Sequence, residues 1–192
     1  SRKMKYTPKP IAPEPAAKPS AKAKTIKPKG TAHLKPPGEI RIIGGQYKRT
    51  RLPVAKLAGL RHTPDRGRET LFNWLGQDLG GWRCFDAFAG TGALGLEAAS
   101  RGAAAVQLVE SDAALVAQLG ELCQRLQATT VQVRRGDGVA QLRQCVPASW
   151  DLVLLDPPFG SDLFEPALQA AARAISPQGF VYLEAAHAWT DE

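Results

Sequence analysis

The sequence predicts a doubly wound α/β fold with a mainly parallel sheet. Three observations support this prediction. Short apolar runs recur from residue 83 onward, segments with helical periodicity fall between them, and a glycine-rich turn follows the first run. Such alternation is typical of a parallel sheet covered by helices on both faces. The 192 residues are enough for one domain of this kind with a tail, and too few for two domains with separate cores.

The main domain is expected over residues 81–192. Its predicted strands are Cys84–Phe85, Val106–Val109, Val131–Val133, Leu152–Leu155 and Phe180–Leu183. Its predicted helices are Ala93–Arg101, Ser111–Leu126, Val139–Cys145 and Glu165–Ile175. Gly102 is a suitable stop for the first helix, because glycine readily adopts the left-handed conformation that ends many helices.

Residues 38–80 are expected to form a small extension made of a hairpin and a helix. Ile40–Ile43 and Gln46–Val54 predict two strands around a turn at Gly44-Gly45. Thr63 is predicted to cap a helix that begins at Pro64 and lies against the main domain. Residues 1–37 are dominated by Lys, Pro and Ala with few large apolar residues, so we expect them to be disordered.

The positive charge of the chain is concentrated near its N-terminus. Residues 1–68 carry 18 Lys and Arg against 3 Asp and Glu, whereas residues 69–192 carry 7 against 15. A basic segment joined to an acidic body suits a polyanionic substrate, although for the tail a purely solubilising role is the alternative. Three widely spaced cysteines predict neither a disulfide framework nor a metal site. Without an apolar span or a secretory signal, a cytoplasmic protein is expected.

Each predicted strand finishes at or near a carboxylate. These acids are Asp86, Glu110, Asp137, Asp156 and Glu184. Ligands of open α/β sheets bind outside the carboxyl ends of the strands, so five acids at that edge predict a binding site for a ligand with positive groups. Capping of the following helix is an additional role expected for Asp137 and an alternative for Glu184.

The glycine-rich turn predicts binding of a nucleotide-like cofactor. Gly90–Gly95 reads G-x-G-x-x-G between a strand and a helix, and Glu110 follows at the distance where an acid can bond ribose hydroxyls. The turn alone does not choose between NAD and S-adenosylmethionine. Asp86, four residues before Gly90, favours the latter, since this placement resembles the first methyltransferase motif, and Asp137 resembles the acid that meets the adenine amine. The expected contacts in the loop are Asp86, Phe88, Gly90, Thr91, Gly92 and Gly95.

The most specific signal is the strand that ends in Asp156-Pro157-Pro158-Phe159. An exocyclic base amine is a poor nucleophile, so methylating it requires acceptors that fix its N–H bonds. Asp156 offers carboxylate oxygens and Pro157 offers a backbone carbonyl, while the prolines hold the loop rigid and bring no N–H groups of their own. Phe159 offers a flat face for a base taken out of its stack. The four residues are therefore the predicted catalytic group.

These motifs closely resemble the bacterial 16S rRNA guanine-N2 methyltransferases of the RsmD family. The resemblance covers about residues 40–184 and is carried by Arg41–Gly45, Gly59–Arg61, Asp65-Arg66, Arg68–Leu75, Asp86–Ala98 and Asp156–Phe159. It implies a Rossmann-like class I methyltransferase that uses S-adenosylmethionine and modifies guanosine 966 on a partly assembled small subunit. It also implies that residues 61–69 close over the cofactor through Arg61 and Thr63. The expected RNA contacts are Lys48, Arg49, Arg51, Arg66 and Arg68.

Some alternatives stay open at this point. The same loop chemistry fits adenine N6 or cytosine N4 in DNA or RNA, and an NAD(P)-dependent oxidoreductase or a non-catalytic RNA-binding protein are further possibilities. The family sheet ends in an antiparallel hairpin after the fifth strand, and this chain is expected to lack it. We expect a monomer without a metal.

Overall fold

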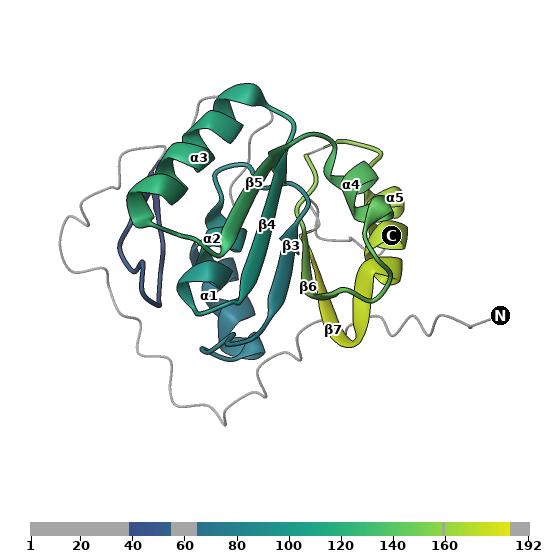
Figure 1. Ribbon diagram of the computed structural model, residues 1–192, viewed down its shortest axis with the longest axis horizontal. Coiled ribbons are helices and arrows are strands. Elements are labelled where there is room, and N and C mark those ends of the chain that lie inside the picture. Colours follow the sequence, from purple (N-terminus) through teal and green to yellow (C-terminus); the bar gives the residue numbers. More distant parts are fainter. Residues whose placement is uncertain (1–38, 55–64, 159, 185–192) are drawn as a thin grey trace, which may run out of the picture.

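A computed structural model of the chain describes residues 39–54, 65–158 and 160–184. Its centre is a five-stranded sheet in which every neighbouring pair is parallel. The strand order is β5-β4-β3-β6-β7, as Figure 1 shows. The strands are β3 (Arg83–Asp86), β4 (Ala105–Glu110), β5 (Val131–Arg135), β6 (Trp150–Leu155) and β7 (Ile175–Leu183). The predicted doubly wound fold is confirmed, and the strand order reverses between β3 and β6, where such sheets bind ligands.

Helices cover both faces of the sheet (Figure 1). One face packs against α1 (Asp65–Leu75), α2 (Ala93–Ser100) and α3 (Ala113–Leu126). The other packs against α4 (Gly138–Gln144) and α5 (Phe164–Ala174). None of the helices in the described ranges is long and apolar enough to cross a bilayer.

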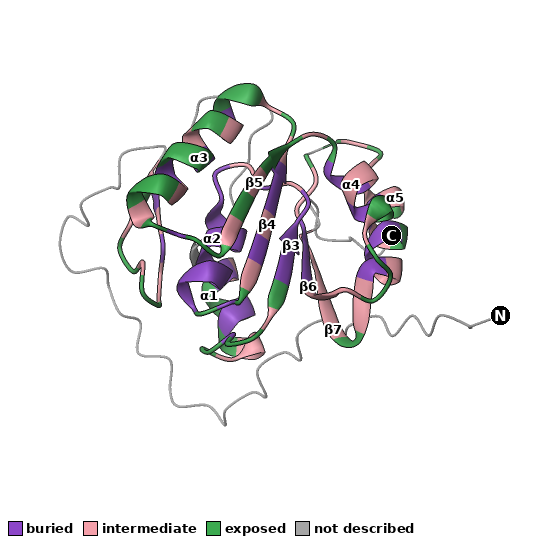
Figure 2. Cartoon of the chain, in the orientation of Figure 1, coloured by how far each residue is buried: buried purple, intermediate pink, exposed green. Residues whose placement is uncertain are grey.

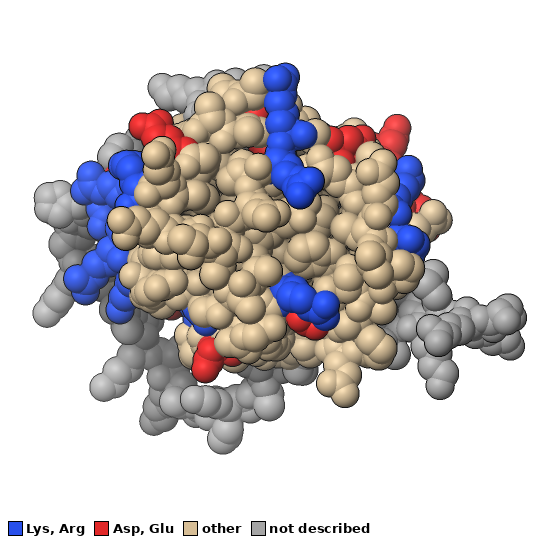
Figure 3. All heavy atoms as spheres, in the orientation of Figure 1, with Lys and Arg blue, Asp and Glu red and all other residues tan. Residues whose placement is uncertain are grey.

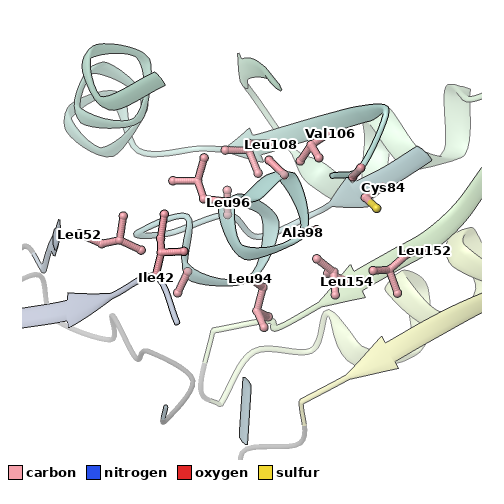
Figure 4. Packing of buried hydrophobic residues seen from close by; sticks show 14 of the residues in the cluster. Ile42, Leu52, Cys84, Leu94, Leu96, Ala98, Val106, Leu108, Leu152 and Leu154 are labelled. Carbon is pink, nitrogen blue, oxygen red and sulfur yellow. The ribbon is translucent and has the colours of Figure 1, made fainter. Parts of the chain in front are cut away.

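The strands supply two hydrophobic cores because their side chains alternate between the faces. In β6, Leu152 and Leu154 belong to the core under α1–α3, whereas Val153 and Leu155 belong to the core under α4 and α5. The central strands β3, β4 and β6 are more buried than the edge strands β5 and β7 (Figure 2), as expected for strands covered on both sides. Leu94 of α2 and Leu154 of β6 both belong to the first core (Figure 4).

The N-terminal extension differs from the predicted hairpin. Its antiparallel strands are only β1 (Glu39–Arg41) and β2 (Arg51–Pro53), and residues 42–50 connect them. Gly44-Gly45 does not form a two-residue turn, because this segment binds the end of α2 instead. A Cβ at Gly45 would lie 2.0 Å from the carbonyl oxygen of Ser100, and Gln46 N donates to that oxygen at 2.8 Å. The segment therefore needs glycine for close approach to α2.

The extension shares the core of the main domain. Ile42 and Leu52 are buried beside Leu96 of α2 (Figure 4). In α1, Leu71 and Phe72 are buried, which confirms that this helix lies against the main domain. The predicted helix start at Thr63 and Pro64 lies outside the described residues, as do the predicted tail at 1–37, Arg61 and Phe159.

Candidate functional site

The five predicted carboxylates lie at one edge of the sheet. Asp86 ends β3 and Glu110 ends β4, while Asp156 and Glu184 directly follow β6 and β7. Asp137 comes two residues after β5. Because the strands are parallel, the acids follow the strand order along the carboxyl edge, from Asp137 through Asp86 at the centre to Glu184.

The glycine loop between β3 and α2 contains two residues in the left-handed region. Gly90 has φ +55° and Gly92 has φ +85°, and α2 starts directly after Gly92. Gly95 meets a different constraint, since a Cβ there would lie 2.2 Å from Cδ2 of Leu108. The glycines therefore permit the tight turn and bring α2 close to β4, as the G-x-G-x-x-G pattern predicts. Thr91 is buried within the loop.

Asp86 stabilises this loop through hydrogen bonds to its backbone. Its carboxylate is almost fully buried and accepts hydrogen bonds from Phe88 N at 3.3 Å and Gly95 N at 3.1 Å. Burial raises the pKa of Asp86 to about 7, and the negative charge of Asp156 acts in the same direction. One carboxylate oxygen bonds each end of the loop. This geometry favours a role for Asp86 in shaping the loop, beyond the direct cofactor contact that the sequence suggested.

Glu110 connects the glycine loop to the next helix. Its Oε1 accepts from Gly90 N at 3.0 Å, and its Oε2 accepts from Asp112 N at 2.7 Å. Asp112 in turn caps α3 by accepting from Leu115 N at 2.9 Å. The acid is thus fixed beside the loop by backbone groups that lie far apart in the sequence.

Asp137 has the additional capping role that the sequence predicted. It is the N-cap of α4 and accepts from Ala140 N at 3.0 Å. The next residue, Gly138, is buried, and a Cβ there would lie 1.7 Å from the carbonyl oxygen of Ala87. Only glycine permits this approach, which brings the start of α4 and with it Asp137 next to the end of β3.

The Asp156-Pro157-Pro158 segment lies next to the glycine loop. Ala87 N, at the start of that loop, donates to the carbonyl oxygen of Leu154 at 3.2 Å. Asp156 and Pro157 are half-buried and Pro158 is exposed. Asp86 is paired with Leu154, two residues before Asp156, in the β3–β6 register, and the charge of Asp156 helps to raise the pKa of Asp86. The predicted cofactor loop and catalytic loop therefore meet at the centre of the carboxyl edge, where the strand order reverses.

Sequence reasoning missed Tyr182 on β7. Its hydroxyl donates a hydrogen bond to Oε2 of Glu184. Burial, followed by this hydrogen bond and by the charges of Glu184 and Asp156, raises the pKa of Tyr182. The signal was present in the sequence, because residues two apart on a strand share a face and Tyr182 is two residues before the predicted acid.

Arg68, which the sequence predicted to contact RNA, is instead buried in the structure. Its side chain is fully buried, lies 3.6 Å from a carboxylate oxygen of Glu97, and donates to the carbonyl oxygen of Arg41 at 2.9 Å. In this position the guanidinium cannot reach RNA. Glu97 also accepts from Ile43 N at 2.7 Å and lies 3.5 Å from Arg101. The pair therefore attaches α1 and the N-terminal extension to α2.

The other predicted RNA contacts differ in position. Lys48, Arg49 and Arg51 are exposed on the β1–β2 extension, and basic side chains gather at the left edge of Figure 3, where the extension lies. Arg51 also pairs with Glu39 at 2.7 Å. The side chain of Arg66 lies outside the described residues.

Comparisons with known proteins agree with the motifs. A family model described as conserved hypothetical protein 95 matches residues 40–191. The ribosomal RNA small subunit methyltransferase D of Escherichia coli K12 is 46% identical over 128 residues, which are 67% of this chain and 64% of that protein. The protein of the same name from Haemophilus influenzae is 39% identical over 154 residues, which are 77% of this chain and 79% of that protein. The chain thus spans less than two thirds of the Escherichia coli relative.

A solved structure agrees with these relatives. The Escherichia coli protein yhhF, described as a candidate methyltransferase, superposes with a TM-score of 0.66 at 40% identity, over 76% of this chain and 80% of that chain. This match confirms the Rossmann-like methyltransferase fold that the motifs predicted. The chain therefore belongs to the family of conserved hypothetical protein 95, which is the family of the ribosomal RNA small subunit methyltransferase D proteins.

Proposed function

We propose that the chain methylates the exocyclic N2 amine of a guanine in 16S rRNA, with S-adenosylmethionine as the methyl donor. One observation carries the proposal. The Asp156-Pro157-Pro158 segment lies next to the glycine loop, which is hydrogen-bonded to Asp86, at the carboxyl edge of the sheet. The names of the relatives support ribosomal RNA as the substrate. The family resemblance supports guanosine 966 as the target base.

The residues at the carboxyl edge fit S-adenosylmethionine. Its sulfonium and ammonium groups are positively charged, and the strands end in a row of acids. Gly90 and Gly92 adopt the positive φ values that the tight turn of the loop requires, and the buried Asp86 holds the shape of the loop. Glu110 and Asp137 are the acids proposed to bond the ribose and the adenine amine. When bound, the cofactor supplies an electrophilic methyl group.

The chain itself supplies acceptors for the amine. Asp156 and the backbone carbonyl of Pro157 are proposed to accept the two N–H bonds of the base, which aims the nitrogen lone pair at the methyl group. Neither Pro157 nor Pro158 has a backbone N–H, so the segment brings no competing donor at these positions. Phe159 is proposed to stack on the extruded base, and Arg61 and Thr63 to cover the cofactor.

RNA is proposed to dock on the N-terminal extension. Lys48, Arg49 and Arg51 are exposed there, and the extension is attached to α2, the helix that follows the glycine loop. Contacts of this kind act on phosphates, so affinity should fall with salt concentration. We propose a partly assembled small subunit as the partner, the cytoplasm as the compartment and a monomer as the active form.

Transfer of a labelled methyl group tests the proposal. The chain is incubated with methyl-labelled S-adenosylmethionine and with small subunits from Escherichia coli cells that lack methyltransferase D. We expect label in the RNA and its recovery as N2-methylguanosine. Subunits from cells that retain the enzyme are the control and should take up little label. Label in adenine or cytosine, or none in RNA, would contradict the proposal.

A further inference from the structure

Asp156 and Glu184 directly follow the neighbouring strands β6 and β7, at the same level of the sheet. Leu155 and Leu183 are partners in the β6–β7 register, and Glu184 N donates to the carbonyl oxygen of Leu155 at 2.9 Å. Leu155 and Leu183 both belong to the core under α4 and α5. Alternation therefore places Asp156 and Glu184 on the opposite face of the sheet, the face that also carries Tyr182.

Tyr182 fixes the position of the Glu184 carboxylate. Its ring packs against the core under α1–α3, and its hydroxyl donates to Oε2 of Glu184. Within residues 39–54, 65–158 and 160–184, no donor reaches the other oxygen, Oε1. The Leu155–Leu183 register places Asp156 and Glu184 at the same level of neighbouring strands, and the charges of both acids also raise the pKa of the Tyr182 hydroxyl. Glu184, whose carboxylate is fixed by Tyr182, and Asp156 therefore follow neighbouring strands at the same edge of the sheet.

Two neighbouring carboxylates match the donors of one base. On its Watson–Crick edge guanine carries N1–H next to the N2 amine, so two adjacent positions donate hydrogen bonds. Adenine and cytosine instead carry a ring nitrogen with a lone pair next to the amine, which a carboxylate repels. An extruded base is read through this edge, and a site built to accept a hydrogen bond strongly rejects an analogue that lacks the donor.

We propose that Glu184, oriented by Tyr182, accepts the N1–H of the guanine whose N2 amine is held by Asp156, and so selects guanine over adenine and cytosine. The inference rests on the proposed function, because it concerns the base that the same site methylates. Glu184 is then a specificity-determining residue, and Tyr182 is a positioning residue that acts through it.

A base analogue separates recognition of N1 from recognition of the amine. 2-Aminopurine keeps the exocyclic amine of guanine but carries a lone pair at N1. Small subunits are reconstituted with ligated 16S rRNA that has either guanine or 2-aminopurine at the position that the parental chain methylates. For the parental chain we expect kcat/KM to be about 100-fold higher on guanine, the size expected for a hydrogen bond to a charged group.

Three variants complete the test. Glu184→Gln should narrow the guanine preference to below about 10-fold, because an amide can turn its N–H₂ group toward a lone pair. Tyr182→Phe removes only the hydroxyl and should narrow the preference to a smaller extent. Glu121→Gln makes the same chemical change at an exposed position on α3 and should keep the parental preference. A merely structural role of Glu184 would lower both rates equally and leave their ratio unchanged.

The outcomes distinguish the inference from the proposed function. A parental chain that methylates 2-aminopurine as fast as guanine would overturn the inference while leaving the proposed function intact. An unchanged ratio in Glu184→Gln would also overturn it. If Glu184→Gln does not fold, the ratio in Tyr182→Phe decides, and a parental ratio there overturns the inference. A parental chain that methylates neither substrate would instead contradict the proposed function and the inference with it.

Discussion

The buried Asp86 should make the stability of the fold depend on pH. Its pKa is about 7 in the folded chain, against an ordinary value of 3.8 that applies when the chain is unfolded. Between these values the folded chain still holds a proton that the unfolded chain has lost. The free energy of unfolding must therefore fall as pH rises through this window. Each unit of difference between the folded and unfolded pKa is worth about 1.36 kcal/mol, so the free energy of unfolding should fall by about 4 kcal/mol across the whole window.

Asp86→Asn removes this proton while keeping the size of the side chain. One amide oxygen can still accept from the loop, and losing the second hydrogen bond should cost about 1 kcal/mol at every pH. Relative to the parental chain, the variant should gain stability as pH rises from about 4 to about 7. The gain of about 4 kcal/mol should make it the more stable protein near about pH 8.

Urea unfolding measures this difference directly. Curves are recorded without cofactor at intervals from about pH 4.5 to about pH 8, and the free energies are extrapolated to zero urea. Asp162→Asn, at an exposed position before α5, is the matched control and should follow the parental curve. Parallel pH profiles for Asp86→Asn and the parental chain would refute the reasoning, since they would show that Asp86 takes up no extra proton on folding.

Four other changes test separate parts of the site. Asp156→Ala should leave the affinity for S-adenosylmethionine nearly intact by calorimetry but abolish methyl transfer, and parental activity would refute the role of this acid. Gly95→Ala should destabilise the fold by about 1–3 kcal/mol in urea, because the added Cβ would lie 2.2 Å from a buried leucine. Glu97→Gln should cost about 3–5 kcal/mol in the same assay, since it leaves two buried arginines without their acid; a loss below about 1 kcal/mol would argue against that pairing. Replacing Lys48 and Arg49 together by alanine should weaken RNA binding with little change in stability. In a salt titration, the slope of the logarithm of the binding constant against the logarithm of salt concentration should become shallower by about two.

The sequence was sufficient for the main sheet and its row of acids. Strands of a parallel sheet are apolar runs of local sequence, and the residue that follows each run is fixed by the chain itself. The positions of Asp86, Asp156 and Glu184 at one edge therefore follow from local pattern and fold class alone. The shapes of the glycine loop and of the α4 cap were also local, because specific backbone conformations require glycine or a capping acid there.

Contacts between distant parts of the chain were not predictable in this way. Arg68 looked like a charged helix residue, and its burial depends on Glu97, which α2 places beside it. The Gly44-Gly45 pair looked like a hairpin turn, but its conformation is set by contact with Ser100. Tyr182 was predictable only in part. Its position on the strand follows from the sequence, but its hydrogen bond to Glu184 is seen only in the structure.

The burial of Arg68 changes how the N-terminal extension is understood. With the buried pair of Arg68 and Glu97 and the backbone bonds to Glu97, the extension and α1 are attached to the helix that follows the glycine loop. The exposed cations Lys48 and Arg49 are thus carried by a segment held firmly to the proposed cofactor site. The cations proposed to bind RNA, Lys48 and Arg49, are therefore distinct from the buried Arg68 that stabilises the fold.

The most direct measurement is nucleoside mass spectrometry of small-subunit RNA after a single reaction. Subunits lacking the modification are incubated with the parental chain or with Asp156→Ala, each with S-adenosylmethionine, and the RNA is digested to nucleosides. We expect N2-methylguanosine with the parental chain and none above background with the variant. Methylated adenosine or cytidine in its place, or equal N2-methylguanosine from both proteins, would contradict it.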